Sequence, residues 1–126
     1  MQKFTRRNTM RTLEIEGNIF EVDFGRDEIS LAIKKLEVDA VAVQEAFNNI
    51  TDVGKREQAI IAEQKRLYRE TIDCILGVGA SEKIFRDGDS QVFYADVYLF
   101  IVKGFTDANT SNAPHASNKA QRRAKK

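Results

Sequence analysis

The sequence is poor in the residue types that build most chemical sites. Its 126 residues include one cysteine, one histidine, one proline and no tryptophan. A lone cysteine can form neither an internal disulfide nor a zinc cluster, which favours a reducing compartment. No apolar run is long enough to cross a bilayer, and no apolar segment of a signal peptide follows the basic N-terminus. We therefore expect a soluble protein with no membrane partner.

Charge is unevenly distributed along the chain. Residues 1–11 carry four basic and no acidic side chains, and residues 107–126 carry five basic and one acidic. Since the whole chain has a net charge of +1, residues 12–106 carry −7. We predict one α-rich domain over 12–106, a flexible basic extension at 1–11 and a disordered basic tail at 107–126. An acidic body between basic ends is unlike a compact nucleic-acid-binding domain.

Residues 12–24 alternate between apolar and polar side chains, which predicts a β-hairpin. Gly17 and Asn18 tolerate positive φ and would form the two-residue turn. That turn places the apolar side chains on one face, with Leu13 opposite Val22 and Ile15 opposite Phe20. Such a hairpin is marginal alone, so we expect it to lie on helices.

The next two segments predict an antiparallel helical pair over about 27–50 and 53–76, joined by a short turn. The first carries an apolar stripe at alternating spacings of three and four residues: Ile29, Ile33, Leu36, Ala40, Val43, Phe47 and Ile50. This spacing is close to a heptad seam, so the stripe could pack inside the domain or against another chain.

The last part of the domain predicts a short helix at 81–86 and a longer one at 90–105. Residues 91–105 are apolar almost all round. Their Val, Phe and Tyr would also suit a strand, but the length of the run favours a buried helix. The fold class is therefore α+β and mainly α, with an N-terminal β-hairpin packed on a bundle of three to four helices.

No catalytic, cofactor or metal site is predicted. Gly77 and Gly79 follow a helix and lack the Gly-Lys-Ser/Thr ending of a phosphate loop, so they are interpreted as a helix end. Cys74 has no base nearby because the only histidine, His115, lies in the tail; it is interpreted as a small buried apolar residue.

The acidic residues near the last helix do not follow a metal-binding pattern. Asp87, Asp89 and Asp96 offer oxygen ligands, but the series of an EF-hand loop is absent. A solvated turn explains Asp87-Gly-Asp89 better. We therefore predict a protein that is not an enzyme and uses no cofactor.

Instead, the chain has more apolar helical surface than a small core requires, which indicates protein–protein binding. The candidate partner-binding residues lie on the first and last long helices: Ile33, Leu36, Val38, Val41, Val43, Phe47, Phe93, Tyr94, Val97, Tyr98, Phe100 and Ile101. For most of these, packing in the domain's own core is the simpler explanation. Val38, Val41, Tyr94 and Tyr98 lie off the stripes and are predicted to be exposed.

Two segments give the chain a resemblance to a known family. The hairpin motif comprises Ile15, Gly17, Phe20, Val22 and Phe24, and the second motif comprises Gly77, Gly79, Ile84 and Phe85. With the order of helices, these resemble the small tail assembly chaperones of long-tailed phages that infect Gram-positive bacteria. The resemblance covers roughly 12–105.

The resemblance implies a non-catalytic factor in the host bacterial cytoplasm that is absent from the mature virion. Such chaperones bind the helical tape measure protein and keep it soluble until tail tube subunits polymerise around it, which makes the tail tube protein a further candidate partner. Exposed apolar surface also favours a homo-oligomer. The alternative is a small nucleic-acid-binding or regulatory phage protein that uses its basic termini.

Overall fold

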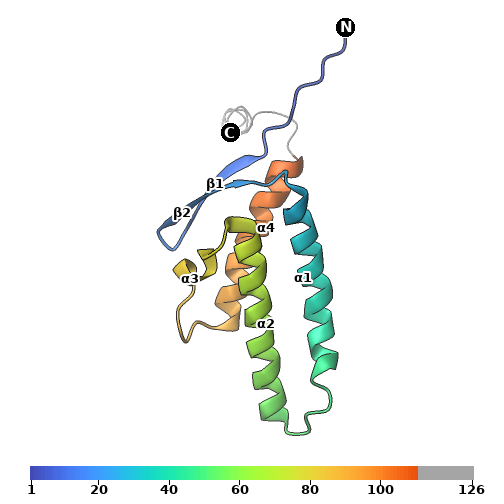
Figure 1. Ribbon diagram of the computed structural model, residues 1–126, viewed down its shortest axis with the longest axis vertical. Coiled ribbons are helices and arrows are strands. Elements are labelled where there is room, and N and C mark those ends of the chain that lie inside the picture. Colours follow the sequence, from blue (N-terminus) through green and yellow to red (C-terminus); the bar gives the residue numbers. More distant parts are fainter. Residues whose placement is uncertain (111–126) are drawn as a thin grey trace, which may run out of the picture.

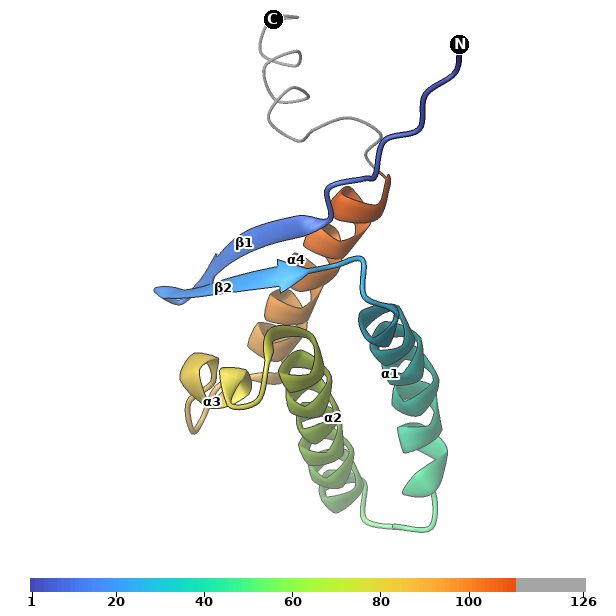
Figure 2. The same ribbon diagram turned by 45° about the horizontal axis from the view of Figure 1, so that its top comes forward.

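A β-hairpin lies across one end of a helical bundle in the computed structural model, which describes residues 1–110 (Figure 1). In chain order the elements are β1 (Met10–Ile15), β2 (Asn18–Asp23), α1 (Asp27–Ala46), α2 (Val53–Leu76), α3 (Ala80–Ile84) and α4 (Gln91–Thr110). The predicted α+β, mainly α fold is confirmed. Helices α1 and α2 run antiparallel, while α4 packs on α2 and β1 (Figure 2).

The hairpin turn differs from the sequence-based expectation by one residue. Glu16 and Gly17 form it, both with positive φ of 51° and 79°. Ile15 therefore pairs with Asn18, and Leu13 pairs with Phe20. Moving the turn by one residue shifts the pairing between the strands by two residues. Because side chains alternate with a period of two, the apolar residues still share one face. The Asn18 amide explains the choice, since it donates to the carbonyls of Ile15 and Lys83 at 3.3 and 3.2 Å.

The apolar face of the hairpin covers the main core. Val22 and Phe24 are only 2% and 1% exposed. Ile72 on α2 and Ile101 on α4 are fully buried. Burying each such side chain contributes about 1.5–3 kcal/mol. A second cluster lies further from the hairpin, between the three long helices: Leu36, Val43, Ile60, Leu67 and Tyr98. The hairpin thus closes one end of the bundle.

Two helices end at residues that their apolar patterns did not predict. Helix α1 stops at Ala46 instead of about residue 50, and the N–H of Asn48 donates to the carbonyl of Glu45 in a closing turn. The asparagines there favour turns over helix. Helix α4 continues to Thr110, past the predicted end at residue 105.

Tertiary contacts explain the extension of α4. Ala108 is fully buried, and the Asn109 side chain donates to the carbonyl of Phe24 at 3.0 Å. Residues 107–110 therefore belong to the folded domain, which corrects their assignment to the tail. The rest of the predicted disordered tail, 111–126, lies outside the described residues.

The predicted N-terminal extension also ends earlier than expected. Met10 and Arg11 belong to β1, and Arg11 Nε lies 3.2 Å from an Asp107 carboxylate oxygen on α4. The hydroxyl of Thr9 donates to Asp23 at 2.5 Å, which extends the contact by one more residue. Arg7 also donates to the Asn109 carbonyl of α4, so contacts with the domain reach back to about residue 7.

The glycine-containing link after α2 forms a helix end and a new helix start. Gly77 terminates α2, and Gly79, with a φ of 89°, precedes α3. The Asp73 carboxylate accepts the Ser81 N–H at 2.8 Å and the Ser81 hydroxyl at 3.1 Å. A side chain of α2 therefore holds the first turn of α3, as expected of a structural link.

Candidate binding groove

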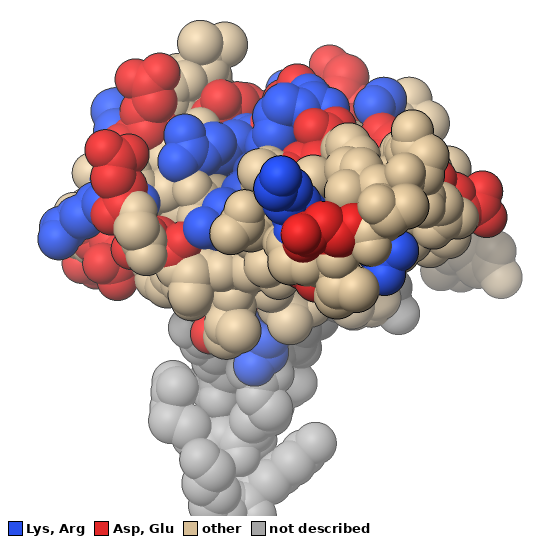
Figure 3. Space-filling model, turned by 90° about the horizontal axis from the view of Figure 1, so that it is seen from below, with Lys and Arg blue, Asp and Glu red and all other residues tan. Residues whose placement is uncertain are grey.

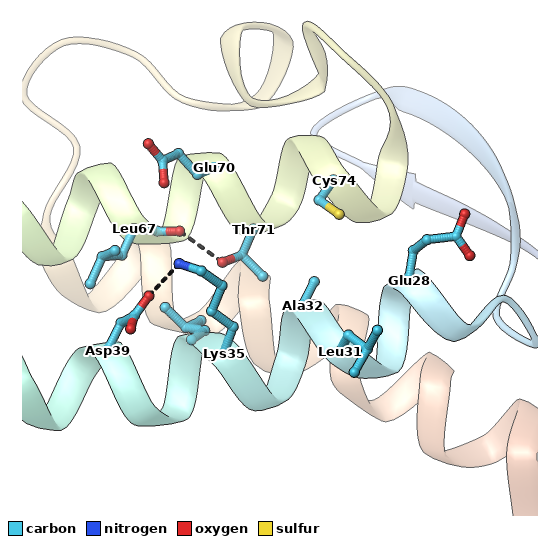
Figure 4. Close-up of a pocket in the computed structure, with 10 residues that line it drawn as sticks. Glu28, Leu31, Ala32, Lys35, Asp39, Leu67, Glu70, Thr71 and Cys74 are labelled. Carbon is cyan, nitrogen blue, oxygen red and sulfur yellow. Dashed lines mark hydrogen bonds and ion pairs between the residues drawn. The ribbon is translucent and has the colours of Figure 1, made fainter.

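The seam between α1 and α2 contains a cavity of about 390 Å³. Figure 4 shows the residues of both helices that line it, with α4 behind them. Leu36, Leu67 and Thr71 are buried and form its floor, whereas Leu31 and Cys74 stand at its exposed edges. The Thr71 hydroxyl donates to the carbonyl of Leu67 at 2.9 Å, so the floor presents little unpaired polarity.

A second cavity of about 250 Å³ continues along the same seam toward the α1–α2 turn. The two cavities share Lys35, Asp39, Leu67 and Glu70 as lining residues, so we treat them as one groove, the α1–α2 groove. Its lining runs along α1 from Glu28 to Phe47, about 28 Å at a rise of about 1.5 Å per residue. This length matches a helix of about five turns.

Charged side chains on the rim of the α1–α2 groove pair with one another. Lys35 Nζ lies 2.6 Å from Asp39, and this contact raises the pKa of Lys35. On α2, Arg66 bonds both Glu63, at 2.5 Å, and Glu70, and the bond from Arg66 lowers the pKa of Glu63. Because these charges are paired on the rim, the groove offers a ligand mainly its apolar floor.

The structure divides the predicted partner-binding residues into three groups. Seven are buried in the domain's own core: Ile33, Leu36, Val43, Tyr94, Val97, Tyr98 and Ile101. Phe47 and Phe93 are half-buried. Val38, Val41 and Phe100 are exposed, at 68%, 71% and 47%. The predicted exposure of Val38 and Val41 is confirmed.

The predicted exposure of the two tyrosines was wrong, because α4 is covered on several sides. Tyr94 is 1% exposed, and its ring stacks on Phe85 with centroids 3.9 Å apart. The Tyr94 hydroxyl accepts from Arg69 Nε and Nη2 at 3.0 and 2.6 Å. Tyr98 is 9% exposed, and its hydroxyl has no hydrogen-bond partner among the described residues. Burial raises the pKa of Tyr98 to about 12, with smaller contributions from Glu37 and Tyr68.

Cys74 was also placed wrongly by the sequence. It is exposed and lines the α1–α2 groove opposite Glu28 and Leu31 (Figure 4). An apolar helical pattern identifies the buried stripe, but it does not show where two stripes stop touching. The sequence could have identified Leu31 as a candidate for partner binding. Like Val38, seven residues later, it is apolar and lies off the stripe of α1.

The acidic loop before α4 is a turn stabilised by one of its own side chains. The Asp89 carboxylate accepts the backbone N–H of Arg86 at 2.7 Å. Within residues 1–110, no three His, Cys, Asp or Glu side chains gather closely enough to hold a metal ion. In the same part of the chain, every helix is too short or too polar to traverse a bilayer.

Comparison of the sequence with known protein families gives a match. Residues 12–126 match the family of unknown function DUF6673. The chain belongs to this family. No curated protein and no solved structure matches the sequence. The match begins in β1 and covers every helix, so the α1–α2 groove lies wholly within the part that defines membership.

Proposed function

We propose that this protein is a non-enzymatic chaperone of phage tail assembly that binds helical segments of the tape measure protein. The observation that carries the proposal is the α1–α2 groove, an open apolar seam about 28 Å long between two antiparallel helices. An amphipathic helix can lay its apolar face in such a groove, with side chains at successive turns as anchors. The resemblance of the two glycine-containing motifs to tail assembly chaperones supports the same reading.

The exposed apolar residues of α1 extend the surface beyond the groove. Leu31 is 65% exposed and Val38 is 68% exposed, one heptad apart on the same side of the helix. A long helical client that is covered by several chaperone copies would bury such residues and stay soluble. The proposed site of action is the bacterial cytoplasm during virion assembly.

Co-expression with the tape measure protein of the same phage tests this function. We expect the tape measure protein to be recovered in the soluble fraction only when this chain is present. Leu31→Asp should abolish that recovery, because it places a charge at the edge of the groove. Val78→Asp is the matched control, since Val78 is 102% exposed in the link after α2 and lies outside the groove.

Equal recovery with Leu31→Asp and with the unchanged protein would refute the groove as the binding site. Insoluble tape measure protein in every co-expression would refute the chaperone function itself. Deleting residues 111–126 distinguishes the chaperone function from the nucleic-acid-binding alternative. If the basic tail binds nucleic acid, the shortened protein should lose its salt-dependent affinity for nucleic acid. Seen from the α1–α2 turn, basic and acidic side chains are interspersed and form no basic face (Figure 3).

A further inference from the structure

A second apolar pocket lies away from the α1–α2 groove and shares none of its lining residues. It has a volume of about 230 Å³ and lies between β1 and the first half of α4. Its apolar wall is formed by Ile15, Phe93, Val97 and Phe100. Phe100 is 47% exposed, although it is a large aromatic residue.

The apolar surface continues beyond this pocket along α4. Val92 and Leu99 are 68% and 61% exposed, and both lie within one turn of a pocket residue. Phe93 is held in place by Phe85 of the preceding segment, with ring centroids 5.8 Å apart at 84°. Phe85 therefore supports the Phe93 side of the apolar wall from within the domain.

Three carboxylates complete the pocket, and no lysine or arginine lines it. They belong to Glu14, Glu16 and Asp96. Among the described residues, none of the three carboxylates forms an ion pair or a side-chain hydrogen bond. All three residues are exposed; Glu14 and Glu16 flank Ile15 at the end of β1, and Asp96 belongs to α4. This combination complements a ligand that has an apolar side chain flanked by positive charge.

We infer that the β1–α4 pocket binds a basic amphipathic segment of a partner protein. One or two apolar side chains of that segment enter beside Phe100, and flanking Lys or Arg side chains reach Glu14, Glu16 and Asp96. Nucleic acid and anionic lipid do not fit, because their phosphates would meet three carboxylates. The inference stands independently of the α1–α2 groove and of the client proposed for it.

Designed peptides of eighteen residues test the inference on the full chain. Each has leucines at i, i+3, i+4 and i+7 spacing, and the remaining positions are Lys, Gln or Glu in three otherwise identical versions. At about 50 mM salt we expect the Lys peptide to bind at least tenfold more tightly than the Glu peptide, measured by fluorescence anisotropy. Amide shifts in NMR spectra should change in β1 and α4.

Matched triple variants localise the charge effect. Glu14→Gln, Glu16→Gln and Asp96→Asn together should weaken binding of the Lys peptide about tenfold, because each exposed ion pair contributes modestly and all three are removed. The control triple changes the net charge equally at exposed carboxylates away from the pocket and should weaken binding less than twofold: Glu45→Gln, Glu57→Gln and Asp87→Asn. Urea midpoints check that both variants are folded.

An apolar variant provides an independent measurement. Phe100→Ser should weaken binding of the Lys and Gln peptides alike, since it removes the apolar contact and leaves the charges in place. Equal losses from the two triple variants, no binding of the Lys peptide up to 1 mM, or shift changes confined to α1 and α2 would overturn the inference. So would self-association that only the pocket triple abolishes, since a second copy would then be the occupant.

Discussion

Two tyrosines on α4, one turn apart, should respond in opposite directions to the same substitution. The Tyr94 hydroxyl accepts two hydrogen bonds from the Arg69 guanidinium, at 3.0 and 2.6 Å. The Tyr98 hydroxyl is also buried but has no partner within residues 1–110. Replacing each with phenylalanine removes one oxygen atom and little else. The pair therefore isolates the energetic effect of satisfying a buried hydroxyl.

The expected magnitudes follow from these contacts. Hydrogen bonds to a charged group contribute about 1.5–3 kcal/mol, and we take the lower end for Tyr94→Phe because Arg69 is half-exposed and regains water. An unsatisfied buried hydroxyl costs about 1–3 kcal/mol, so Tyr98→Phe should stabilise the fold by about 1 kcal/mol. The two variants should differ by about 2.5 kcal/mol in the free energy of unfolding.

Urea denaturation followed by circular dichroism measures this difference. With a slope of about 1.5 kcal/mol per molar urea, the midpoints of the two variants should lie more than about 1 M apart. In an Arg69→Met background, Tyr94→Phe should cost less than about 0.5 kcal/mol, because the donor is already absent. Destabilisation by Tyr98→Phe equal to that by Tyr94→Phe would refute the reasoning.

The same tyrosine makes a prediction about alkaline stability. Because the pKa of Tyr98 is raised to about 12 in the fold, chiefly by burial, its neutral form is favoured there. The stability that depends on keeping Tyr98 neutral is therefore fully present below the unfolded pKa of about 10 and is lost as the pH rises toward 12. Tyr98→Phe should reduce the loss of stability over this range, measured by urea midpoints at successive pH values.

Three further substitutions test local features. Glu16→Asn should stabilise the hairpin by about 0.5–1 kcal/mol in urea, since asparagine adopts the observed φ of 51° more readily than glutamate does. Gly104→Ala should destabilise by about 1 kcal/mol, because a Cβ would lie 3.2 Å from the Phe24 ring and outweigh the gain in helix propensity; a stabilised variant would show that the ring can move. Thr9→Val should raise the pKa of Asp23 toward its ordinary value, because the Thr9 hydroxyl is the main cause of its lowering. The lowered pKa of Asp23 stabilises the fold above the unfolded pKa, and this contribution is lost as the pH falls through the folded pKa. An NMR titration of Asp23 that is unchanged in the Thr9→Val variant would contradict the role of the Thr9 hydroxyl.

The alternation and helical spacing of apolar residues predicted the elements of this fold. Alternation over 12–24 identified the hairpin, and Asp52, whose side chain accepts the N–H of Lys55 at 3.0 Å, marks the observed start of α2 at Val53. These features depend on neighbours in sequence, and side-chain direction within one element follows from its period alone. Local chemistry was therefore enough to place the hairpin and four helices in order.

The tertiary structure decided which apolar surfaces remain available. Tyr94, predicted to be exposed, is buried, and Cys74, predicted to be buried, is exposed. Both outcomes depend on packing between distant segments: α2, β1 and Phe85 cover α4, while an open groove runs between α1 and α2 at Cys74. The end of α4 at Thr110 likewise depends on Phe24, far away in the chain. Helical periodicity determines the direction of a face within its own helix, while only the assembled neighbours determine whether that face is covered.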